Sequence, residues 1–348
     1  MYRGTYTLIG SELSMFSRKL EAQLRYQAIP HRWQFKTLAR TPQLETRAQT
    51  RFIPLLQTPD GWLLHDTIAV GPMLDARFPA VPVIPTTPAQ RGACFVLEDF
   101  FNHWFPRHAL HARWCYPEDI AAAGQGFGAN MVFDQSKDVP LTAAQQAELT
   151  GFGQGMVESF GAFACRVQGA DADQSHAIRA DFDQLMGLLA DHFRHHPFLL
   201  GGRACLADFI VVGVLVAHFL QDPSPRAWLG PQLQDFEAYV QRVWAADNGG
   251  AWPADDSLPQ TLQPLFAHAV HHYHRFALAS IEAAARGERT FVLDLGHGPF
   301  TARAMKRLEK ARLHVKDELE QCGTADTALA TSGALAFYER PPILPVRR

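Results

Sequence analysis

Hydrophobic and polar positions follow two different periods in the first part of the chain. Residues 6–9 form a short apolar run of the kind found in strands, and the run ends at Gly10. Phe16, Leu20 and Leu24 then recur every four positions with polar and charged residues between them, which predicts an amphipathic helix. A strand followed by a helix is therefore expected near the beginning of the chain.

Three further strands and a second helix are expected before residue 80. Residues 33–35 alternate between apolar and polar, and two apolar runs at 55–57 and 62–64 flank a Pro-Asp-Gly sequence. Proline presets φ and glycine accepts a positive φ, so this tripeptide indicates a tight turn between two strands. A helix is expected over 66–78, whereas residues 37–51 show no clear period.

Four prolines mark a change in the pattern. They fall within the ten residues 79–88, where neither a helix nor a central strand can run through. Strand signals disappear beyond this point. Helices are expected over residues 95–105, 142–168, 176–194, 206–220, 229–244, 260–286 and 301–321.

These patterns divide the chain into four segments. The expected segments are an α/β domain at 1–79, a Pro-rich linker at 80–90, an all-α domain at 91–285, and an extra C-terminal helix and tail at 286–348. Residues 106–140 are expected to be irregular, and the Pro-rich residues 338–348 to be extended or disordered.

Composition and charge exclude several classes of protein. Hydrophobic residues are 47% and charged residues 19%, which supports a sizeable core and excludes a disordered chain. The formal net charge of −3 offers no basic excess for a nucleic-acid partner. The longest apolar run, residues 209–217, is shorter than the ~20 residues that span a bilayer. Together with five cysteines in no C-x-x-C pair, these features predict a cytoplasmic protein without a membrane partner.

Six short motifs occur in a characteristic order. They are SMFSRK at residues 14–19, IP at 29–30, FIPLL at 52–56, LHDTIA at 64–69, LDARFP at 74–79 and LGGRACLADF at 200–209. In these motifs the chain resembles the cytosolic glutathione S-transferases. The resemblance covers about the first 80 residues and the stretch around 198–220.

The resemblance implies both a fold and an activity. It implies a thioredoxin-like N-terminal domain followed by an all-α domain of the glutathione transferase type. Glutathione would be the co-substrate, with no metal, and the second substrate would be an apolar electrophile. The family also implies a homodimer and a role in detoxification.

Ser14 is the residue expected to activate the thiol. It lies at the predicted N-terminus of the first helix, where free N–H groups and the helix dipole favour negative charge. Lowering the pKa of a free thiol, ~8.5, by ~2 units requires under ~3 kcal/mol, which a donated hydrogen bond and a helix end can supply. The alternative is that Ser14 only caps the helix. Ser11 and Ser17 are the fallback candidates, and Tyr6 lies too early in its strand.

Ile53 and Pro54 are expected to hold the cysteinyl part of glutathione. The resemblance implies a cis peptide bond between them, which turns the N–H and C=O groups of Ile53 outward to pair with an extended peptide. From the residues alone, a trans proline that opens an edge strand is the simpler interpretation, because only ~5–6% of X–Pro bonds are cis.

Asp66 and Thr67 are expected to hold the γ-glutamyl end of the ligand. Thr67 could cap the predicted helix, or its hydroxyl and N–H could bind a ligand carboxylate at the positive end of the dipole. Asp66 could orient the ligand ammonium group. Ordinary capping is the alternative for both residues.

Departures from the family pattern leave a second function class open. Met15 stands where the family has proline, and Cys205 stands where a serine or threonine normally caps a helix. A glutathione-binding or scaffold protein that keeps the fold without turnover is therefore the alternative. No cysteine occupies the position of Ser14, so a transferase that forms a mixed disulfide on its own cysteine is not expected.

A histidine cluster at residues 268–274 is the remaining chemical signal. His268 and His272 are four residues apart on a predicted helix and could bind one metal ion. No carboxylate or cysteine accompanies them at ligand spacing, so a solvated or aromatic-packed face is favoured and no metal is expected. A metal-dependent oxidoreductase is a remote third possibility.

Overall fold

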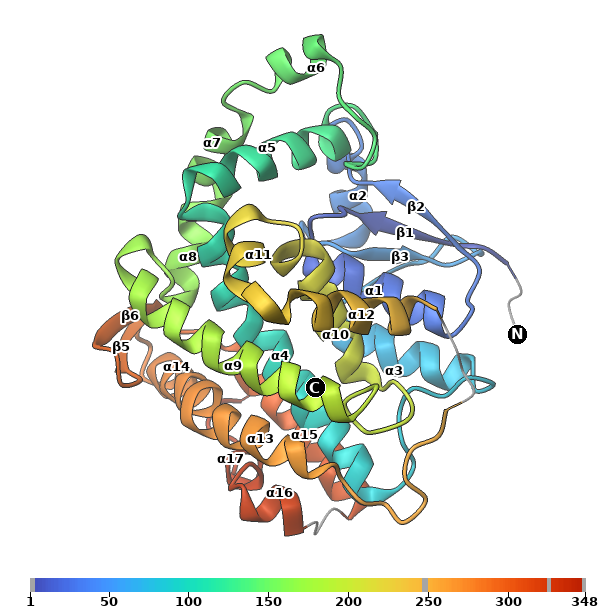
Figure 1. Ribbon diagram of the computed structural model, residues 1–348, viewed down its shortest axis with the longest axis vertical. Helices are drawn as coiled ribbons and strands as arrows, with labels where there is room; N and C mark the ends of the chain where they lie inside the picture. The colour runs from blue at the N-terminus through green and yellow to red at the C-terminus, as the bar shows by residue number, and fades with distance from the viewer. Residues whose placement is uncertain (1–3, 246–249, 324–326, 346–348) are drawn as a thin grey trace. The chain divides into compact units, whose positions relative to one another are not determined.

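The computed structural model describes residues 4–245, 250–323 and 327–345 (Figure 1). The chain divides by its internal contacts into two compact units. The first unit comprises Met1–Ile84, Ala112–Phe160 and Asp208–Asn248, and the second comprises Pro85–His111, Gly161–Ala207 and Gly249–Arg348. This grouping follows tertiary contacts, and the segment boundaries at residues 79, 90 and 285 stay a prediction.

A four-stranded mixed sheet forms the centre of the N-terminal part. Its strands are β1 (Tyr6–Gly10), β2 (His31–Phe35), β3 (Leu55–Gln57) and β4 (Leu63–His65), and their order is β2-β1-β3-β4. β1 and β2 are parallel, whereas β3 pairs antiparallel with both β1 and β4. Figure 1 draws these strands in blue.

Three helices accompany this sheet. They are α1 (Met15–Tyr26), α2 (Thr41–Ala48) and α3 (Thr67–Arg77). With the four strands they give the thioredoxin-like order β-α-β-α-β-β-α, so the expected fold class of this domain is confirmed. The sequence showed no period over α2 because only Leu44 and Ala48 of that helix are buried.

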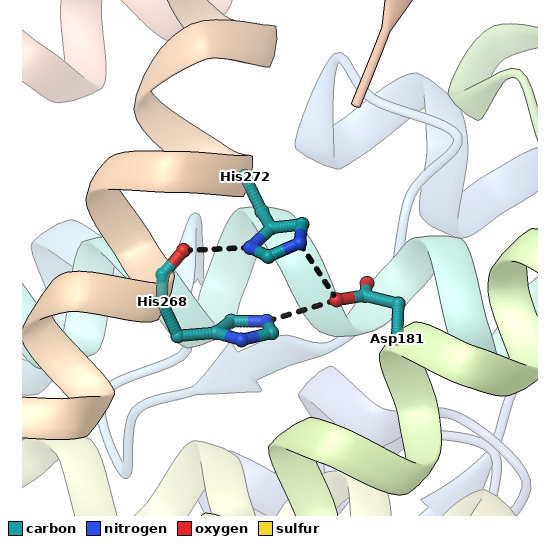
Figure 2. A group of neighbouring side chains, drawn as sticks. All are labelled: Asp181, His268 and His272. Carbon is teal, nitrogen blue, oxygen red and sulfur yellow. Dashed lines mark hydrogen bonds and ion pairs between the residues drawn. The ribbon is translucent and has the colours of Figure 1, made fainter. Parts of the chain in front are cut away.

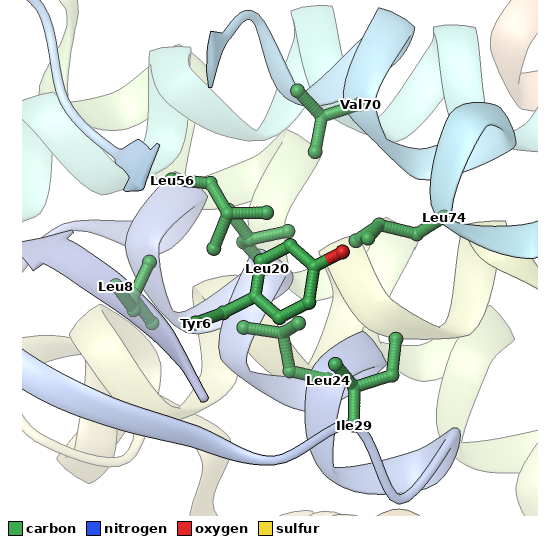
Figure 3. Packing of buried hydrophobic residues seen from close by; sticks show 8 residues of the cluster. All are labelled: Tyr6, Leu8, Leu20, Leu24, Ile29, Leu56, Val70 and Leu74. Atoms are coloured by element: carbon green, nitrogen blue, oxygen red, sulfur yellow. The ribbon is translucent and has the colours of Figure 1, made fainter. Parts of the chain in front are cut away.

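One hydrophobic core cluster contains many of the residues whose spacing predicted the first strand and the first helix. Figure 3 shows its buried members, which are Tyr6, Leu8, Leu20, Leu24, Ile29, Leu56, Val70 and Leu74. A second, smaller cluster of Ile9, Leu44, Ala48 and Leu55 includes the two buried residues of α2. The alternation along β1 therefore places successive residues in different clusters, as a pleated strand requires.

The first unit also contains helices from later in the chain. They are α5 (Pro117–Met131), α6 (Ala143–Glu148), α7 (Phe152–Met156), the π-helical η1 (Val157–Gly161), α10 (Leu206–Val214, from Asp208 onward), η3 (Leu215–Phe219), α11 (Pro223–Leu229), η4 (Gly230–Gln232) and α12 (Leu233–Trp244). The expected helices at 142–168, 206–220 and 229–244 are therefore present, although several are broken into shorter pieces.

The irregular structure expected over residues 106–140 is wrong. α4 (Pro88–Trp114) and α5 occupy most of that stretch. Glycines hid α5 because they weaken a helix signal. They allow close packing instead, since a Cβ on Gly124 would lie 2.7 Å from the backbone of Gly153 on α7.

The second unit is mainly helical. It contains α4 up to His111, α8 (Ala162–Gln168), η2 (Ala172–Gln174), α9 (Ser175–His195), η5 (Gln260–Leu262), α13 (Gln263–Ala269), η6 (Val270–His274), α14 (Arg275–Ala285), α15 (Arg307–Cys322), α16 (Thr327–Thr331) and α17 (Leu335–Glu339). The aromatic run at 95–105 is buried in this unit, as expected of a core helix.

The C-terminal region differs from the expected helix and tail. A hairpin of β5 (Thr290–Asp294) and β6 (Pro299–Arg303) precedes α15, so the helix expected from residue 301 begins later. The end expected to be extended or disordered from residue 338 is wrong for residues 338–339, which belong to α17, whereas residues 340–345 contain neither helix nor strand. Arg312 fixes this segment by donating to carbonyl oxygens of Phe337 and Pro341 at 3.1 Å each. Residues 346–348 of that expectation lie outside the described residues.

Length and composition give little sign of a membrane span. No single described helix is long and apolar enough to cross a bilayer. Leu206–Phe219 and Pro223–Trp244, which are bent by 116° at their junction, reach the required length and hydropathy only when taken together.

Candidate functional site

The sheet topology brings the five predicted site residues to one end of the sheet. Ser14 follows the C-terminal end of β1, and Ile53 and Pro54 precede the N-terminal end of β3. Ile9 lies opposite Leu55, and Leu55 opposite His65, in the ladder. Because β3 runs antiparallel to both neighbours, its beginning lies beside the ends of β1 and β4.

Asp66 and Thr67 complete this end of the sheet. They follow β4 directly, at the beginning of α3. All five residues thus come from three chain segments of the first unit that meet beside one another.

Ser14 is the N-cap of α1, as both interpretations of the sequence required. Its backbone is extended, with φ −100° and ψ 118°, and its Oγ accepts a hydrogen bond from the Ser17 N–H at 3.3 Å. A hydroxyl has one donor hydrogen besides its acceptor lone pairs. The cap therefore uses Ser14 only as an acceptor, and since no described residue accepts from its O–H, that hydrogen stays available to donate.

The two fallback serines are less accessible than Ser14. Ser11 is buried, and its hydroxyl donates to Asn130 Oδ1 at 2.8 Å. Ser17 is fully buried inside α1, with its Oγ 3.5 Å from the backbone N–H of Ser11. Ser14 is the one of the three that is partly exposed. Tyr6 belongs to the hydrophobic core, where burial raises the pKa of its phenol (Figure 3).

Two side chains from later helices hold the loop before α1. Asn130 on α5 accepts from Ser11 and from the Glu12 N–H, and donates to Glu12 Oε2 at 3.1 Å. Arg113 donates to the carbonyl oxygen of Leu13 at 2.6 Å. The residues on the N-terminal side of Ser14 are therefore fixed by contacts that no local pattern revealed.

Arg113 is itself held in a buried ion pair. It donates to both carboxylate oxygens of Asp222, at 2.9 and 3.0 Å, and to the carbonyl oxygen of Ala217. Burial alone would raise the pKa of Asp222, but the Arg113 guanidinium and His218 outweigh burial and lower the pKa. The arginine keeps its orientation toward Leu13 because the pair is bidentate.

The Ile53–Pro54 peptide bond is cis, as the resemblance implied. Pro54 is buried, whereas Ile53 is partly exposed. Among the described residues, neither the N–H nor the carbonyl of Ile53 has a hydrogen-bond partner. This backbone is therefore free to pair with an extended ligand.

Asp66, and not Thr67, caps α3. The Asp66 carboxylate accepts from the Ile68 N–H at 3.2 Å, and its backbone has the positive φ of 71°. The capping role suggested for Thr67 is thus wrong. The Thr67 hydroxyl and N–H have no partner within the described part of the chain, so both remain available to a ligand anion.

The residues suited to a metal ion lie in the second unit, away from these five in sequence. Asp181, His268 and His272 bring one ligand atom each within 4.8 Å of one another. The histidines were expected to lie on a solvated or aromatic-packed face without a carboxylate nearby. The absence of a carboxylate is wrong, because His268, which is only 3% exposed, faces Asp181. Sequence spacing missed Asp181 because it lies on a different helix, α9.

Comparisons with known proteins find similarity among solved structures. No protein-family model matches the chain, and neither does any curated protein. A glutathione S-transferase of Methylobacterium radiotolerans in complex with glutathione sulfonate is 16% identical, with a TM-score of 0.39, over 74% of this chain and 95% of that one. The fold assignment itself rests on the sheet topology.

Two further solved structures are also similar. A glutathione transferase of Phanerochaete chrysosporium is 13% identical, with a TM-score of 0.46, over 71% of this chain and 98% of that one. A glutathione S-transferase of Ceriporiopsis subvermispora in complex with glutathione is 15% identical, with a TM-score of 0.45, over 70% of this chain and 99% of that one. All three carry the name of the family that the sequence motifs resemble.

Proposed function

We propose that the chain is a glutathione transferase-like enzyme that stabilises the glutathione thiolate at Ser14 for attack on an apolar electrophile. The observation that carries the proposal is the hydroxyl of Ser14. It is partly exposed, it accepts from the Ser17 N–H, and its own hydrogen is free to donate at the N-terminus of a 12-residue helix. A thiolate sulfur is an acceptor that suits this position.

The chemistry requires little from the protein beyond orientation and charge stabilisation. The thiol of glutathione loses its proton to solvent, and the Ser14 O–H donates to the resulting sulfur anion. The sulfur electron pair then forms a bond to the electrophilic carbon, and the leaving group departs with the electrons of the broken bond. No covalent bond to the enzyme forms, so catalysis rests on orientation and thiolate stabilisation.

Ile53, Pro54, Asp66 and Thr67 would bind the rest of the tripeptide. The free N–H and carbonyl of Ile53 would pair with the cysteinyl backbone, in the manner of strand addition to a sheet edge. The Thr67 hydroxyl and N–H would bind the γ-glutamyl carboxylate at the N-terminus of α3. Asp66, which uses one interaction to cap the helix, would bind the γ-glutamyl ammonium group.

A protein that binds glutathione without turnover is the competing function. Its support is that Ser14 already has a structural role as the helix cap, which explains a serine at this position without catalysis. The two functions share the binding site and differ only in what the Ser14 hydroxyl does for the thiol.

Turnover of an aryl halide by the wild-type chain and by Ser14→Gly separates the two functions. Glycine is a tolerated N-cap, so this variant removes the hydroxyl at a stability cost of a few tenths of a kcal/mol. A lost hydrogen bond to a charged group is worth about 1.5–3 kcal/mol, so kcat/KM should fall about 10- to 100-fold. Ser14→Thr keeps the hydroxyl and should retain most activity.

Binding measurements complete the test. Glutathione affinity by calorimetry should change little in Ser14→Gly, while the pKa of bound glutathione, followed by thiolate absorbance, should rise. Wild-type protein that binds glutathione but turns over no electrophile would support the competing function. Absence of any glutathione binding would contradict both functions.

Assembly and location remain predictions, and the assembly is carried over from the family. A homodimer is expected, and light scattering of the purified chain measures its mass directly. A role in detoxification follows from the same resemblance. The cytoplasmic location predicted from the cysteines and the apolar runs is tested by fluorescence microscopy of a tagged chain.

A further inference from the structure

Two histidines and an aspartate converge inside the second unit. His268 lies in the last turn of α13, His272 lies in the π-helical segment η6 that follows, and Asp181 reaches them from α9 (Figure 2). His268 Nε2 is 2.9 Å and His272 Nε2 is 3.7 Å from the same carboxylate oxygen, Asp181 Oδ1. Short π-helical segments inserted in α-helices are frequent at functional sites.

The orientation of His272 leaves one nitrogen free for a ligand bond. Its Nδ1 lies 3.1 Å from the carbonyl oxygen of His268. A carbonyl can only accept, so Nδ1 carries the hydrogen, and a neutral ring then keeps the lone pair on Nε2. Metal-bound histidines commonly donate their second nitrogen to a backbone carbonyl in this way.

Only one carboxylate oxygen of Asp181, Oδ2, accepts hydrogen bonds from described residues. Its Oδ2 accepts from the Trp104 indole N–H at 2.9 Å and from His108 Nε2 at 2.8 Å. Its Oδ1 is buried and makes no hydrogen bond in the described structure, because the approach of His268 Nε2 has the distance of an ion pair without hydrogen-bond geometry. Apart from the two histidine nitrogens, this buried oxygen meets no partner among the described residues, although a buried charge requires one.

His268 is also short of partners, since neither of its ring nitrogens makes a hydrogen bond to a described residue.

We propose that Asp181 Oδ1, His268 Nε2 and His272 Nε2 bind one divalent transition-metal ion, with Zn²⁺ the best match to this donor set. Two imidazole nitrogens and a carboxylate oxygen are ligands that suit Zn²⁺. Metal–ligand bonds of about 2.0–2.2 Å place the donors roughly 3.0–3.5 Å apart. The present donors lie within 4.8 Å of one another, so small side-chain rotations bring them onto one ion.

Two of the three residues, Asp181 and His272, border a small hollow, which provides a further coordination position. The hollow has room for about one water molecule and is also lined by Trp104 and Arg107, with His297 and Gly298 from the β5–β6 loop. Three protein ligands beside an accessible space are typical of a metal site that keeps a bound water or substrate. Burial lowers the pKa of Arg107 to about 10, so it remains a cation and favours a small anion in the hollow.

The competing explanation is a metal-free ion pair between Asp181 and a protonated His268. It accounts for the 2.9 Å distance, and in it His272 is oriented by its Nδ1 contact with the His268 carbonyl and by stacking on the His268 ring, at 4.0 Å between ring centroids. Zn²⁺ binding by the purified full-length chain, stripped with a chelator and dialysed, distinguishes the two explanations.

Calorimetric titration with Zn²⁺ and visible absorption of the Co²⁺-substituted chain are the measurements. The wild-type chain should bind one Zn²⁺ per chain, and Co²⁺ should give the absorption of a site with nitrogen and oxygen ligands. His272→Gln and Asp181→Asn should each weaken Zn²⁺ binding by at least about 100-fold, since each removes one of three ligands. Circular dichroism of the stripped variants shows whether they fold.

His271→Gln is the matched control, because His271 lies on the same π-helical segment but is exposed. Its Zn²⁺ affinity should equal that of the wild-type chain. No Zn²⁺ or Co²⁺ binding by the folded wild-type chain would overturn the proposal, and so would a folded His272→Gln that binds as tightly as the control. These readouts do not depend on glutathione or on transferase activity.

Discussion

Asn130 accepts a 2.8 Å hydrogen bond from the hydroxyl of Ser11, across 119 positions of sequence. The same carboxamide oxygen accepts from the Glu12 N–H at 3.0 Å, and its NH₂ group donates to the Glu12 carboxylate and to the carbonyl of Gln135. One buried amide on α5 thus fixes the loop that ends at the α1 cap. The position of Ser14 depends on this contact.

Asn130→Ala should therefore impair the candidate site without touching the ligand. Four hydrogen bonds are lost and the Ser11 and Glu12 groups are left buried, so the free energy of unfolding should fall by about 1–3 kcal/mol. Both kcat and KM for glutathione should change, because of the two contacts that hold the loop before α1 only the Arg113 contact then remains. Urea unfolding and steady-state kinetics measure the two effects.

Gln146→Ala, at an exposed position of α6, is the control for Asn130→Ala. It should leave stability and kinetics unchanged. A fully active and stable Asn130→Ala would show that the loop before α1 is held without the amide.

Asp66 combines a positive φ with a charge, and two substitutions separate these properties. Asp66→Asn keeps a capping oxygen and a side chain that tolerates positive φ, but removes the charge. Without the proposed ammonium contact, glutathione affinity should fall about 10-fold, in line with about 1.5 kcal/mol for a lost hydrogen bond to a charged group. Calorimetry with glutathione measures the affinity.

Asp66→Gly should weaken glutathione binding to the same extent and also stabilise the folded chain. Glycine relieves the backbone strain at φ 71°, of order 1–3 kcal/mol, at a capping cost of a few tenths of a kcal/mol. Asp60→Asn, exposed in the β3–β4 turn, controls for loss of charge alone. Unchanged affinity in both Asp66 variants would remove Asp66 from the proposed site.

Stability should decrease on mild acidification because of buried neutral histidines. His274 stacks on Phe337 at 4.4 Å between ring centroids, and burial lowers the pKa of its imidazole from 6.5 to about 4. Between these values the unfolded chain binds a proton at this position that the folded chain does not, so the free energy of unfolding falls as the pH falls. The full loss from this group is about 3 kcal/mol.

Urea unfolding at several values from about pH 7 to about pH 5 checks this dependence. His274→Phe keeps a ring beside Phe337 but cannot titrate, and its stability should vary less steeply with pH. Exposed His271→Gln is the control and should retain the wild-type slope. Equal slopes for His274→Phe and the wild-type chain would contradict a neutral buried His274.

Arg312 should be essential for the order of the C-terminal segment. It is fully buried, pairs with both oxygens of Glu309 at 2.8 and 2.9 Å, and donates to carbonyls of residues 337–341. Arg312→Met leaves the Glu309 carboxylate buried without its cation, so the chain should lose about 3–5 kcal/mol of stability. Limited proteolysis should then cleave the segment that follows α16.

The exposed pair of Arg286 and Glu288 offers the control for this change. Arg286→Met should alter stability little, because solvent screens an exposed ion pair. Adding Glu309→Gln to Arg312→Met should recover part of the loss, since it removes the unpaired charge. A tail that stays resistant to protease in Arg312→Met would mean that apolar packing alone holds it.

Some features of the candidate site were readable from neighbouring residues. The N-cap position of Ser14, the turn at residues 59–61 and the helix start at Asp66 each depend on a few consecutive residues, and local backbone preferences decide them. The cis bond at Pro54 came from the motif resemblance, because the residues alone favour trans.

Other features depended on residues far apart in the chain. α5 looked like a loop because its glycines carry no apolar period, and only the close approach of α7 explains them. The hydrogen bond between Ser11 and Asn130 and the ion pair between Asp181 and His268 join positions far apart in sequence, which no local spacing pattern predicts.

The amino-acid sequence by itself determined the four strands of the first sheet, the helices that begin near Ser14 and Asp66, the proline-rich break and the cap at Ser14, because periodicity and turn chemistry act over a few bonds. Only the tertiary structure decided which serine is exposed, which carboxylate faces the histidines and where the C-terminal segment binds. These outcomes arise from burial, which removes water as a partner and makes polar groups pair across the fold.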